Sequence, residues 1–393
     1  MTDVKMKQQM VKQFASVYGE ADNINVYFAP GRVNLIGEHT DYNGGHVFPC
    51  ALTIGTYAAA RKNDLNKIRV YSKNFATLGI LETDLNTIEY KQEQDFANYP
   101  FGVIKTLQQL GYSIESGIDI CYFGNIPNSS GLSSSASIEV VTAYLAREEF
   151  GFDLDYVTMS KLTQMAENQF IGVNCGIMDQ FAIAMGKENH AIFLDTSNLE
   201  YQYAPIQLEN EKIVIACSNK KRGLGDSKYN ERRSQCETAL ARIQTIMKIN
   251  SLGDLSIKEF EEVKGIINDE VLIRRAKHAV YENQRTIQAV EALKYKDLSL
   301  FGELMIASHN SLRDDYEVTG IELDTLVEEA LKQPGVIGSR MTGAGFGGCT
   351  VSIVAKEHID NFIQLVGTAY RDKIGYAADF YIVDIGCGPL SLE

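Results

Sequence analysis

Residues 31–45 read GRVNLIGEHTDYNGG and place one arginine, one histidine, two carboxylic acids and four glycines within fifteen positions. Arg32, Glu38 and Asp41 could not lie together on a buried strand unless each charge found a partner. Glycine lets the backbone turn tightly and approach a ligand closely. The segment therefore predicts a loop that binds a small polar ligand, and a solvated turn with scattered charges is the alternative.

The segment PNSSGLSSSAS, residues 127–137, joins a predicted strand to a predicted helix and contains six serines and one glycine. Serine hydroxyls cap the free N–H groups of a helix start, and the uncapped N–H groups can bind an anion. Gly131 would admit a phosphate close to the backbone, and a serine hydroxyl could ligate Mg²⁺. The segment predicts a phosphate loop, with a ligand-free serine cap as the alternative. It is not a Walker A loop, because it contains no lysine.

Two acidic residues outside these loops could take part in phosphoryl transfer. Asp179, in GVNCGIMDQF, could accept a proton from a hydroxyl that attacks phosphorus, although it could also cap a short helix. Arg32 nearby would keep Asp179 ionised and would stabilise charge on the transferred phosphoryl group. Glu167, in a predicted helix, could bind Mg²⁺, although a helical glutamate is usually a solvated surface residue.

A third segment, MTGAGFGGCT at residues 341–350, contains the pattern GxGxxG. A dinucleotide-binding fingerprint needs a helix after these glycines, and here they lead directly into the apparent strand CTVSIVA. A protein-kinase glycine loop is also excluded, because the chain has no HRD or DFG element. We interpret the segment as a loop of close backbone approach that supports the same site.

Length and composition restrict the classes of protein that can hold these segments. A chain of 393 residues exceeds what one hydrophobic core usually serves, so we expect two domains. The net charge of −14 argues against nucleic-acid and acidic-membrane partners, while a local anion site stays possible. Seven scattered cysteines without a CxxC pair predict reduced thiols. A polar N-terminus and the lack of a long apolar run predict a soluble, cytoplasmic protein.

Hydrophobic periodicity predicts the elements that must position these residues. Helices are predicted at residues 4–18, 96–110, 135–150, 157–170, 226–248, 256–264, 269–293, 297–308, 321–332 and 358–371. Strands are predicted at residues 24–29, 46–60, 68–72, 117–127, 191–196, 213–219, 349–355 and 379–385. Helices and strands interleave without a regular βαβ rhythm, which favours an α+β fold. A break after the strand at 191–196 predicts one domain at 1–200 and a second at 201–393.

Taken together, the three segments resemble the motifs of the galactokinase branch of the GHMP small-molecule kinase family. Residues 31–45 resemble its sugar motif, residues 127–137 its ATP-phosphate motif and residues 341–350 its C-terminal glycine motif. Their order and spacing agree along nearly the whole chain. The resemblance implies a two-domain α+β GHMP kinase fold with the active site in the interdomain cleft. It also implies ATP-dependent phosphorylation of D-galactose at the anomeric C1 hydroxyl, giving α-D-galactose 1-phosphate and ADP.

The resemblance further implies a role for individual side chains. Asp179 would be the catalytic base, and Arg32 would assist it. The residues implied to contact the sugar are Glu38, His39, Thr40, Asp41 and Tyr229. The residues implied to contact ATP are Ser72, Ser129, Ser130, Gly131, Leu132, Ser133, Ser134 and Ser135. Ser135 and Glu167 would hold Mg²⁺.

Two other functions stay open at this point. One is kinase activity on a related sugar such as N-acetylgalactosamine or arabinose, since one changed polar contact can alter discrimination strongly. The other is a non-catalytic relative that senses galactose and ATP and binds a regulator. Sensors of that kind have a damaged serine motif, whereas Ser135 and Ala136 are present here. We therefore expect an enzyme that acts as a monomer on a sugar and ATP.

Overall fold

The computed structural model describes residues 3–19, 22–126, 131–220 and 225–393. Its first sheet has six strands in the order β13-β1-β3-β6-β4-β5. Neighbouring strands are antiparallel except β4 and β6, which are parallel. The bounds are β1 Asn25–Asn34, β3 Pro49–Asn63, β4 Lys67–Ser72, β5 Leu81–Asp84, β6 Gly117–Gly124 and β13 Leu390–Ser391.

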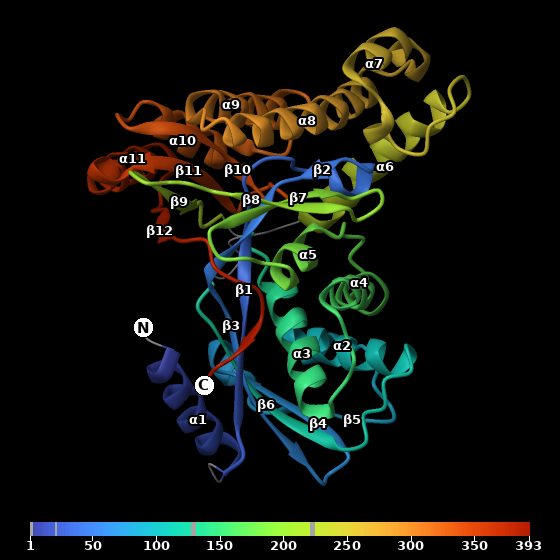
Figure 1. Cartoon of the computed structure of the whole chain (residues 1–393), viewed down its shortest axis with the longest axis vertical. Coiled ribbons are helices and arrows are strands. Elements are labelled where there is room, and N and C mark those ends of the chain that lie inside the picture. Colours follow the sequence, from blue (N-terminus) through green and yellow to red (C-terminus); the bar gives the residue numbers. More distant parts are fainter. Residues whose placement is uncertain (1–2, 20–21, 127–130, 221–224) are drawn as a thin grey trace.

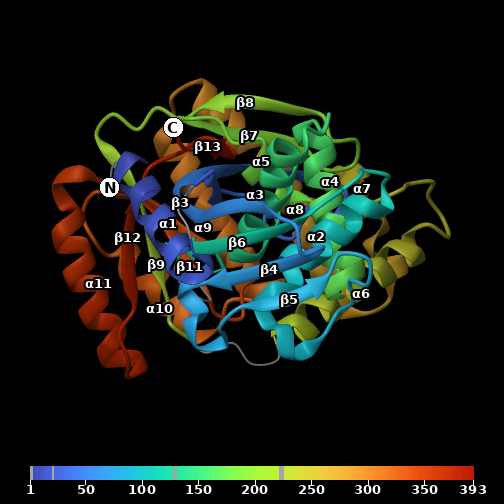
Figure 2. The ribbon, with the colours of Figure 1, turned by 90° about the horizontal axis from the view of Figure 1, so that it is seen from below.

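Helices cover both faces of this sheet (Figures 1 and 2). On β3, Ala58 and Ala60 face the core that the sheet shares with α2, α3 and α4. Tyr57 and Ala59 alternate with them and face the core shared with α1. This alternation follows from the two-residue period of a strand, and both sets are apolar because both faces are buried. The helix bounds are α1 Asp3–Tyr18, α2 Asn98–Gln109, α3 Ser134–Phe150, α4 Tyr156–Ala166 and α5 Met178–Ala184.

A second, fully antiparallel sheet has the strand order β10-β11-β9-β12. On β9, Ile213 and Ile215 face α8 and α9, while Val214 and Ala216 face α10 and α11. The strands are β9 Glu211–Cys217, β10 Val336–Thr342, β11 Cys349–Ala355 and β12 Asp379–Val383. The helices are α6 Gly225–Ile243, α7 Ile257–Val263, α8 Glu270–Lys294, α9 Leu298–Asp314, α10 Gly320–Leu331 and α11 Ile359–Ile374.

A small third sheet joins the two halves of the chain. It consists of β2 His46–Val47, β7 His190–Asp195 and β8 Tyr201–Pro205 in the order β2-β7-β8. The predicted boundary after residue 200 falls in the β7–β8 hairpin, where Leu194 pairs with Tyr201, and that boundary stays a prediction. One apolar core contains Val33 of β1 together with Ile215 of β9, so residues 31–45 start where the halves meet.

Short helical turns lie between these helices and strands in the described residues. They are η1 Asp41–Asn43, η2 Lys73–Leu78, η3 Gln92–Ala97, the π-helix η4 Glu167–Ile171, η5 Leu252–Asp254, η6 Lys264–Ile267 and η7 Lys356–His358. None of the helices in the described ranges is long and apolar enough to span a bilayer.

The predicted helices and strands correspond to observed elements, with ends that differ by up to about six residues, except that the strand predicted at 46–60 is two strands, β2 and β3, which belong to different sheets. Periodicity missed α5, β5, β8, β10 and β13, all of which are seven residues or shorter. The prediction of reduced cysteines was wrong for one pair, because Cys217 and Cys349 form a disulfide. These residues lie directly opposite each other on β9 and β11, a register that a separation of 132 residues does not reveal.

The close contact between α9 and β10 depends on two glycines. A Cβ added at Gly302 would lie 2.0 Å from the carbonyl oxygen of Ile337, and one at Gly338 would lie 2.7 Å from Cα of Gly302. Backbone cannot move aside as a flexible side chain can. We expect Gly302→Ala to lower the free energy of unfolding by about 1–3 kcal/mol through overpacking.

The matched control is Gly265→Ala, because a Cβ there would meet nothing within 4 Å. Its free energy of unfolding should change by less than about 0.5 kcal/mol. Denaturant midpoints of both variants, measured under identical conditions, provide the comparison. Equal stability of the two variants would show that the contact between α9 and β10 does not need glycine.

Candidate active site

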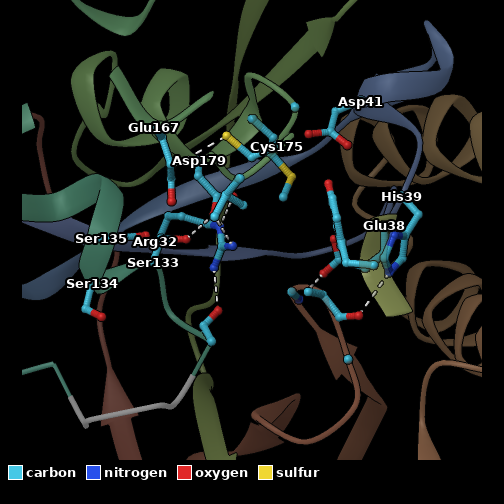
Figure 3. Close-up of a pocket in the computed structure, with 18 of the residues that line it drawn as sticks. Arg32, Glu38, His39, Asp41, Ser133, Ser134, Ser135, Glu167, Cys175 and Asp179 are labelled. Atoms are coloured by element: carbon cyan, nitrogen blue, oxygen red, sulfur yellow. Dashed lines mark hydrogen bonds and ion pairs between the residues drawn. The ribbon is translucent and has the colours of Figure 1, made fainter. Parts of the chain in front are cut away.

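A cavity of about 260 Å³ lies where residues 31–45 meet the first turn of α3, the start of α5 and the glycine-rich segment (Figure 3). Its polar and charged lining residues are Arg32, Glu38, His39, Asp41, Tyr99, Ser133, Ser134, Ser135, Glu167, Cys175, Asp179 and Tyr229. Its remaining lining residues are Gly131, Val173, Gly176, Met178, Gly343, Ala344, Gly345 and Phe346. Segments far apart in the sequence therefore converge on one small space.

Arg32 is the cation at the centre of this cavity. Its Nε and Nη2 atoms donate to Oδ1 and Oδ2 of Asp179, each at 2.7 Å. Its Nη1 atom donates to the carbonyl oxygen of Gly131, also at 2.7 Å. The Arg32 side chain is 4% exposed and that of Asp179 is 31% exposed, so this bidentate pair is only partly shielded from solvent screening. One guanidinium thus links β1 to the loop before α3 and to α5.

The N-terminus of α3 opens into the same cavity. Ser133 precedes the helix in the left-handed backbone conformation, with a φ of 60°, and its hydroxyl donates to Oδ2 of Asp179. Ser134 and Ser135 form the first helical positions and also line the cavity. A helix N-terminus presents unpaired N–H groups and the positive end of the helix dipole. The arrangement can bind a phosphate beside Asp179.

Glu167 is a buried carboxylate beside the first turn of α3. Its Oε2 atom accepts hydrogen bonds from Nε2 of Gln180 at 2.6 Å and from Sγ of Cys175 at 3.6 Å. Burial raises the pKa of Glu167 to about 7, and a hydrogen bond from Ser135 acts in the opposite direction. In the described residues, no lysine or arginine forms an ion pair with Glu167. The site therefore holds a carboxylate and a hydroxyl that could share a cation.

Glu38 is almost completely buried and is held by polar groups from both halves of the chain. Its carboxylate accepts hydrogen bonds at 2.6 Å from the side chain of Asn34 and from the backbone N–H of Gly343. Arg340 on β10 lies 3.5 Å away. Burial raises the pKa of Glu38, and the charge of Arg340 opposes that rise. These contacts fix the glycine-rich segment against residues 31–45.

Asp41 begins η1 and faces the cavity from the side opposite to Ser133–Ser135 (Figure 3). Burial raises the pKa of Asp41 to about 7, and the nearby charges of Asp179 and Glu38 act in the same direction. A Cβ added at Gly176 would lie 1.8 Å from Oδ2 of Asp41. Because residue 176 has no side chain, the carboxyl group of Asp41 fits against its backbone.

His39 is buried and neutral beside these carboxyl groups. Burial lowers the pKa of its imidazole to about 3. Nδ1 lies 2.7 Å from the hydroxyl of Tyr42, and Nε2 lies 3.2 Å from the carbonyl oxygen of Ala344. The ring centre of Tyr229, on α6, lies 5.6 Å from that of His39. The two rings form an aromatic wall of the cavity.

Three predicted contact residues do not line the cavity. The Thr40 hydroxyl faces the carbonyl oxygens of Gly37 and His46 at 2.8 and 2.7 Å, so it closes the turn of residues 31–45. Leu132 is buried in the apolar core beside the cavity, and Ser72 is buried at the end of β4. Their roles stay predictions. The predicted contacts Ser129 and Ser130 lie outside the described residues.

Sequence reasoning missed several residues that shape the site. Arg340 directly precedes the glycine-rich segment, but its pairing with Glu38 depends on how β10 meets the end of β1 at Asn34. Gln180 follows Asp179 directly and is a polar residue before an apolar run. This pattern could have predicted a buried amide, and in the structure the Gln180 amide donates a hydrogen bond to Glu167. The need for glycine at position 176 could not be predicted, because Asp41, its neighbour in the structure, is far away in the sequence.

Comparison with known protein families agrees with this geometry. A galactokinase galactose-binding signature matches residues 12–62. The GHMP kinases N terminal domain matches residues 98–187, and the GHMP kinases C terminal domain matches residues 289–371. The two-domain α+β fold and the cleft site therefore define a small-molecule kinase of the GHMP class.

Similarity to individual proteins shows to which branch of this class the chain belongs. The chain is 60% identical over 383 residues to the galactokinase of Clostridium beijerinckii, covering 98% of this chain and 97% of that protein. The structure of Lactococcus lactis galactokinase complexed with galactose matches with a TM-score of 0.96 and 48% identity, covering 98% and 99% of the two chains. Methanococcus jannaschii mevalonate kinase, at a TM-score of 0.64 and 22% identity, shares the fold. The chain belongs to the galactokinases.

The raised pKa of Glu167 predicts a pH-dependent cost to stability. Between its ordinary value of 4.5 and about 7, the folded protein binds the Glu167 proton more tightly than the unfolded chain does. The free energy of unfolding therefore falls as the pH rises through this window. We expect Glu167→Gln to stabilise the protein on the order of 2 kcal/mol at about pH 8 without divalent cations.

The gain in free energy of unfolding from Glu167→Gln should shrink towards about pH 5, where Glu167 is already largely protonated. Denaturant unfolding at both pH values measures it. Glu357→Gln is the control, because that side chain is 81% exposed and should give no pH-dependent gain. A Glu167→Gln variant that is less stable than the parent protein at the higher pH would contradict the assignment.

Proposed function

We propose that this cavity binds D-galactose and ATP and transfers the γ-phosphoryl group to the C1 hydroxyl of the sugar. The products are α-D-galactose 1-phosphate and ADP. The observation that carries the proposal is the placement of Asp179, paired with Arg32, directly beside the N-terminus of α3. A carboxylate that can accept a proton thus lies next to an anion site, as phosphoryl transfer to a hydroxyl requires.

Asp179 is the proposed catalytic base. As the C1 oxygen forms its bond to the γ-phosphorus, the bond to the β–γ bridging oxygen breaks and the hydroxyl proton passes to Asp179. Arg32 holds the carboxylate in place and presents a positive charge to the transferred group, whose oxygens carry negative charge. Positioning and electrostatics supply most of the catalysis, because phosphoryl transfer needs little covalent chemistry from the protein.

The sugar is proposed to lie against Glu38, His39, Asp41 and Tyr229, on one side of Arg32. Ser133, Ser134 and Ser135 lie on the other side, so Arg32 and Asp179 separate the two groups (Figure 3). Glu38 and Asp41 can accept hydrogen bonds from sugar hydroxyls, and the aromatic wall can pack against the apolar face of the ring. Thr40 supports this side by closing the turn.

ATP is proposed to place its phosphates at Gly131, Ser133, Ser134 and Ser135. A positive φ of 74° at Gly131 suits a loop that approaches an anion closely. Leu132, Ser72, Ser129 and Ser130 stay as predicted nucleotide contacts.

Mg²⁺ is proposed to bind the hydroxyl of Ser135 and the carboxylate of Glu167. Hard oxygen donors of this kind, completed by phosphate oxygens and water, suit Mg²⁺. The buried Glu167 lacks a cationic side chain among the described residues, so it fits a site that receives a metal ion with the nucleotide. The ion would neutralise phosphate charge when bound.

We further propose that the protein works as a monomer in the cytoplasm on small molecules alone. The net charge of −14 opposes binding to nucleic acids and acidic membranes.

ADP release in the presence of different sugars tests this function. We expect release with galactose and Mg²⁺, and at least about tenfold less with glucose, N-acetylgalactosamine or arabinose, because unpaired polar groups in a site discriminate strongly. Chelation of Mg²⁺ should stop the reaction. The Asp179→Asn variant, which keeps the size of the side chain, is the matched control and should retain less than about a tenth of the turnover.

Faster turnover of another sugar would reassign the substrate. No ADP release with any sugar would favour a galactose-sensing protein over an enzyme. Turnover above a tenth of the parent rate in Asp179→Asn would contradict the role of Asp179 as the base.

A further inference from the structure

The turn at residues 315–318, between α9 and α10, contacts three walls of the cavity and is called the Tyr316 turn below. Arg232 on α6 donates from Nε to the carbonyl oxygen of Tyr316 at 2.8 Å. The backbone N–H of Phe346, in the glycine-rich segment, donates to the carbonyl oxygen of Val318 at 2.7 Å. Because α6 also carries Tyr229, this turn links two cavity walls through its backbone.

The side chain of Tyr316 reaches the third wall. Its hydroxyl oxygen lies 2.8 Å from that of Tyr42, which in turn lies 2.7 Å from Nδ1 of His39. Sγ of Cys236, on α6, lies 3.2 Å from the same Tyr316 hydroxyl. Tyr316, Cys236 and His39 are buried. The four side chains therefore form one hydrogen-bonded chain that ends at residues 31–45.

The direction of every bond in this chain follows from its end at His39. A carbonyl oxygen can only accept, so Nε2 of His39 must donate to Ala344. The lowered pKa of His39 keeps the ring neutral, which leaves Nδ1 as an acceptor. Tyr42 then donates to His39, Tyr316 donates to Tyr42, and the Cys236 thiol donates to Tyr316.

Ring packing holds the same residues. The ring centre of Tyr316 lies 4.8 Å from that of His39 and 4.4 Å from that of His278 on α8. Nε2 of His278 lies 3.1 Å from the backbone carbonyl oxygen of Glu38. Tyr316 thus supports both proposed sugar contacts, His39 through its hydroxyl chain and Glu38 through the packed His278.

We propose that Tyr316 is a positioning residue for sugar binding, which holds Tyr42 as the hydrogen-bond donor to Nδ1 of His39 and joins three walls of the cavity. The proposal rests on the function proposed above, which places the sugar against His39. Both ring nitrogens of His39 form hydrogen bonds within the protein. His39 is therefore held with its ring beside that of Tyr229, where the sugar is proposed to lie.

Steady-state kinetics of Tyr316→Phe test this role. The variant removes one hydroxyl and keeps the ring, so Tyr42 loses its donor in a buried place. We expect the KM for galactose to rise about tenfold, with kcat and the KM for ATP within about twofold of the parent protein. Cys236→Ala, which removes only the last donor of the chain, should show a smaller rise of the galactose KM.

Tyr281→Phe is the matched control, because that hydroxyl bonds to Glu261 at an exposed site on α8. It should leave all three constants unchanged. An unchanged galactose KM in Tyr316→Phe would overturn the proposal, as would equal changes in the KM for both substrates.

NMR of protein labelled with ¹⁵N-histidine gives a readout that does not depend on turnover. The parent protein should show His39 protonated at Nε2 and unprotonated at Nδ1, and the Nδ1 resonance should move in Tyr316→Phe. Protonation at Nδ1 would overturn the proposal even if the enzyme phosphorylates galactose. Conversely, a failure to phosphorylate any sugar would leave this measurement of the hydrogen-bonded chain intact.

Discussion

The ion pair between Arg32 and Asp179 is the interaction on which the geometry of the site depends. Arg32 lies after a register shift between β1 and β3 at Pro30, and such a bulge can redirect a side chain. From there one guanidinium bonds to α5 through Asp179 and to the loop before α3 through Gly131. Together with the hydrogen bond from Ser133 to Asp179, this pair holds the proposed base beside the proposed phosphate loop.

The cavity around this pair is acidic, and the charge of Arg32 opposes the rise in the pKa of Glu38. Glu38, Asp41, Glu167 and Asp179 line one small space, and burial raises the pKa of the first three. Arg340 partly compensates Glu38, while Asp41 and Glu167 keep a raised pKa of about 7. Such a site is expected to sacrifice stability for function, because the proposed sugar and the proposed cation would complete it only on binding.

Much of the site could be predicted from the sequence, because its residues lie in compact segments. Residues 31–45 supply Arg32 from the end of β1 and Glu38, His39 and Asp41 from the segment that follows it, and the first turn of α3 supplies adjacent serines. Long periodic elements such as α8 were also predictable, since a helix of 25 residues repeats its apolar pattern many times.

Contacts between distant segments could not be predicted in this way. Arg340 meets Glu38 from β10, and Tyr316 meets Tyr42 from the turn between α9 and α10. Cys236, on α6, joins them through Tyr316. The Cys217–Cys349 disulfide likewise depends on the pairing of β9 with β11. Short elements such as α5, with seven residues, carry too little periodicity to be recognised, although α5 holds Asp179.

A double-mutant cycle on kcat tests most directly whether Arg32 and Asp179 act as one unit. The cycle compares Arg32→Gln, Asp179→Asn and the double variant, with ATP binding as the check that each is folded. If the pair is a unit, the double variant should be no more than about threefold slower than Asp179→Asn alone. Losses that multiply, so that the double variant is slower by the product of both single effects, would contradict the account.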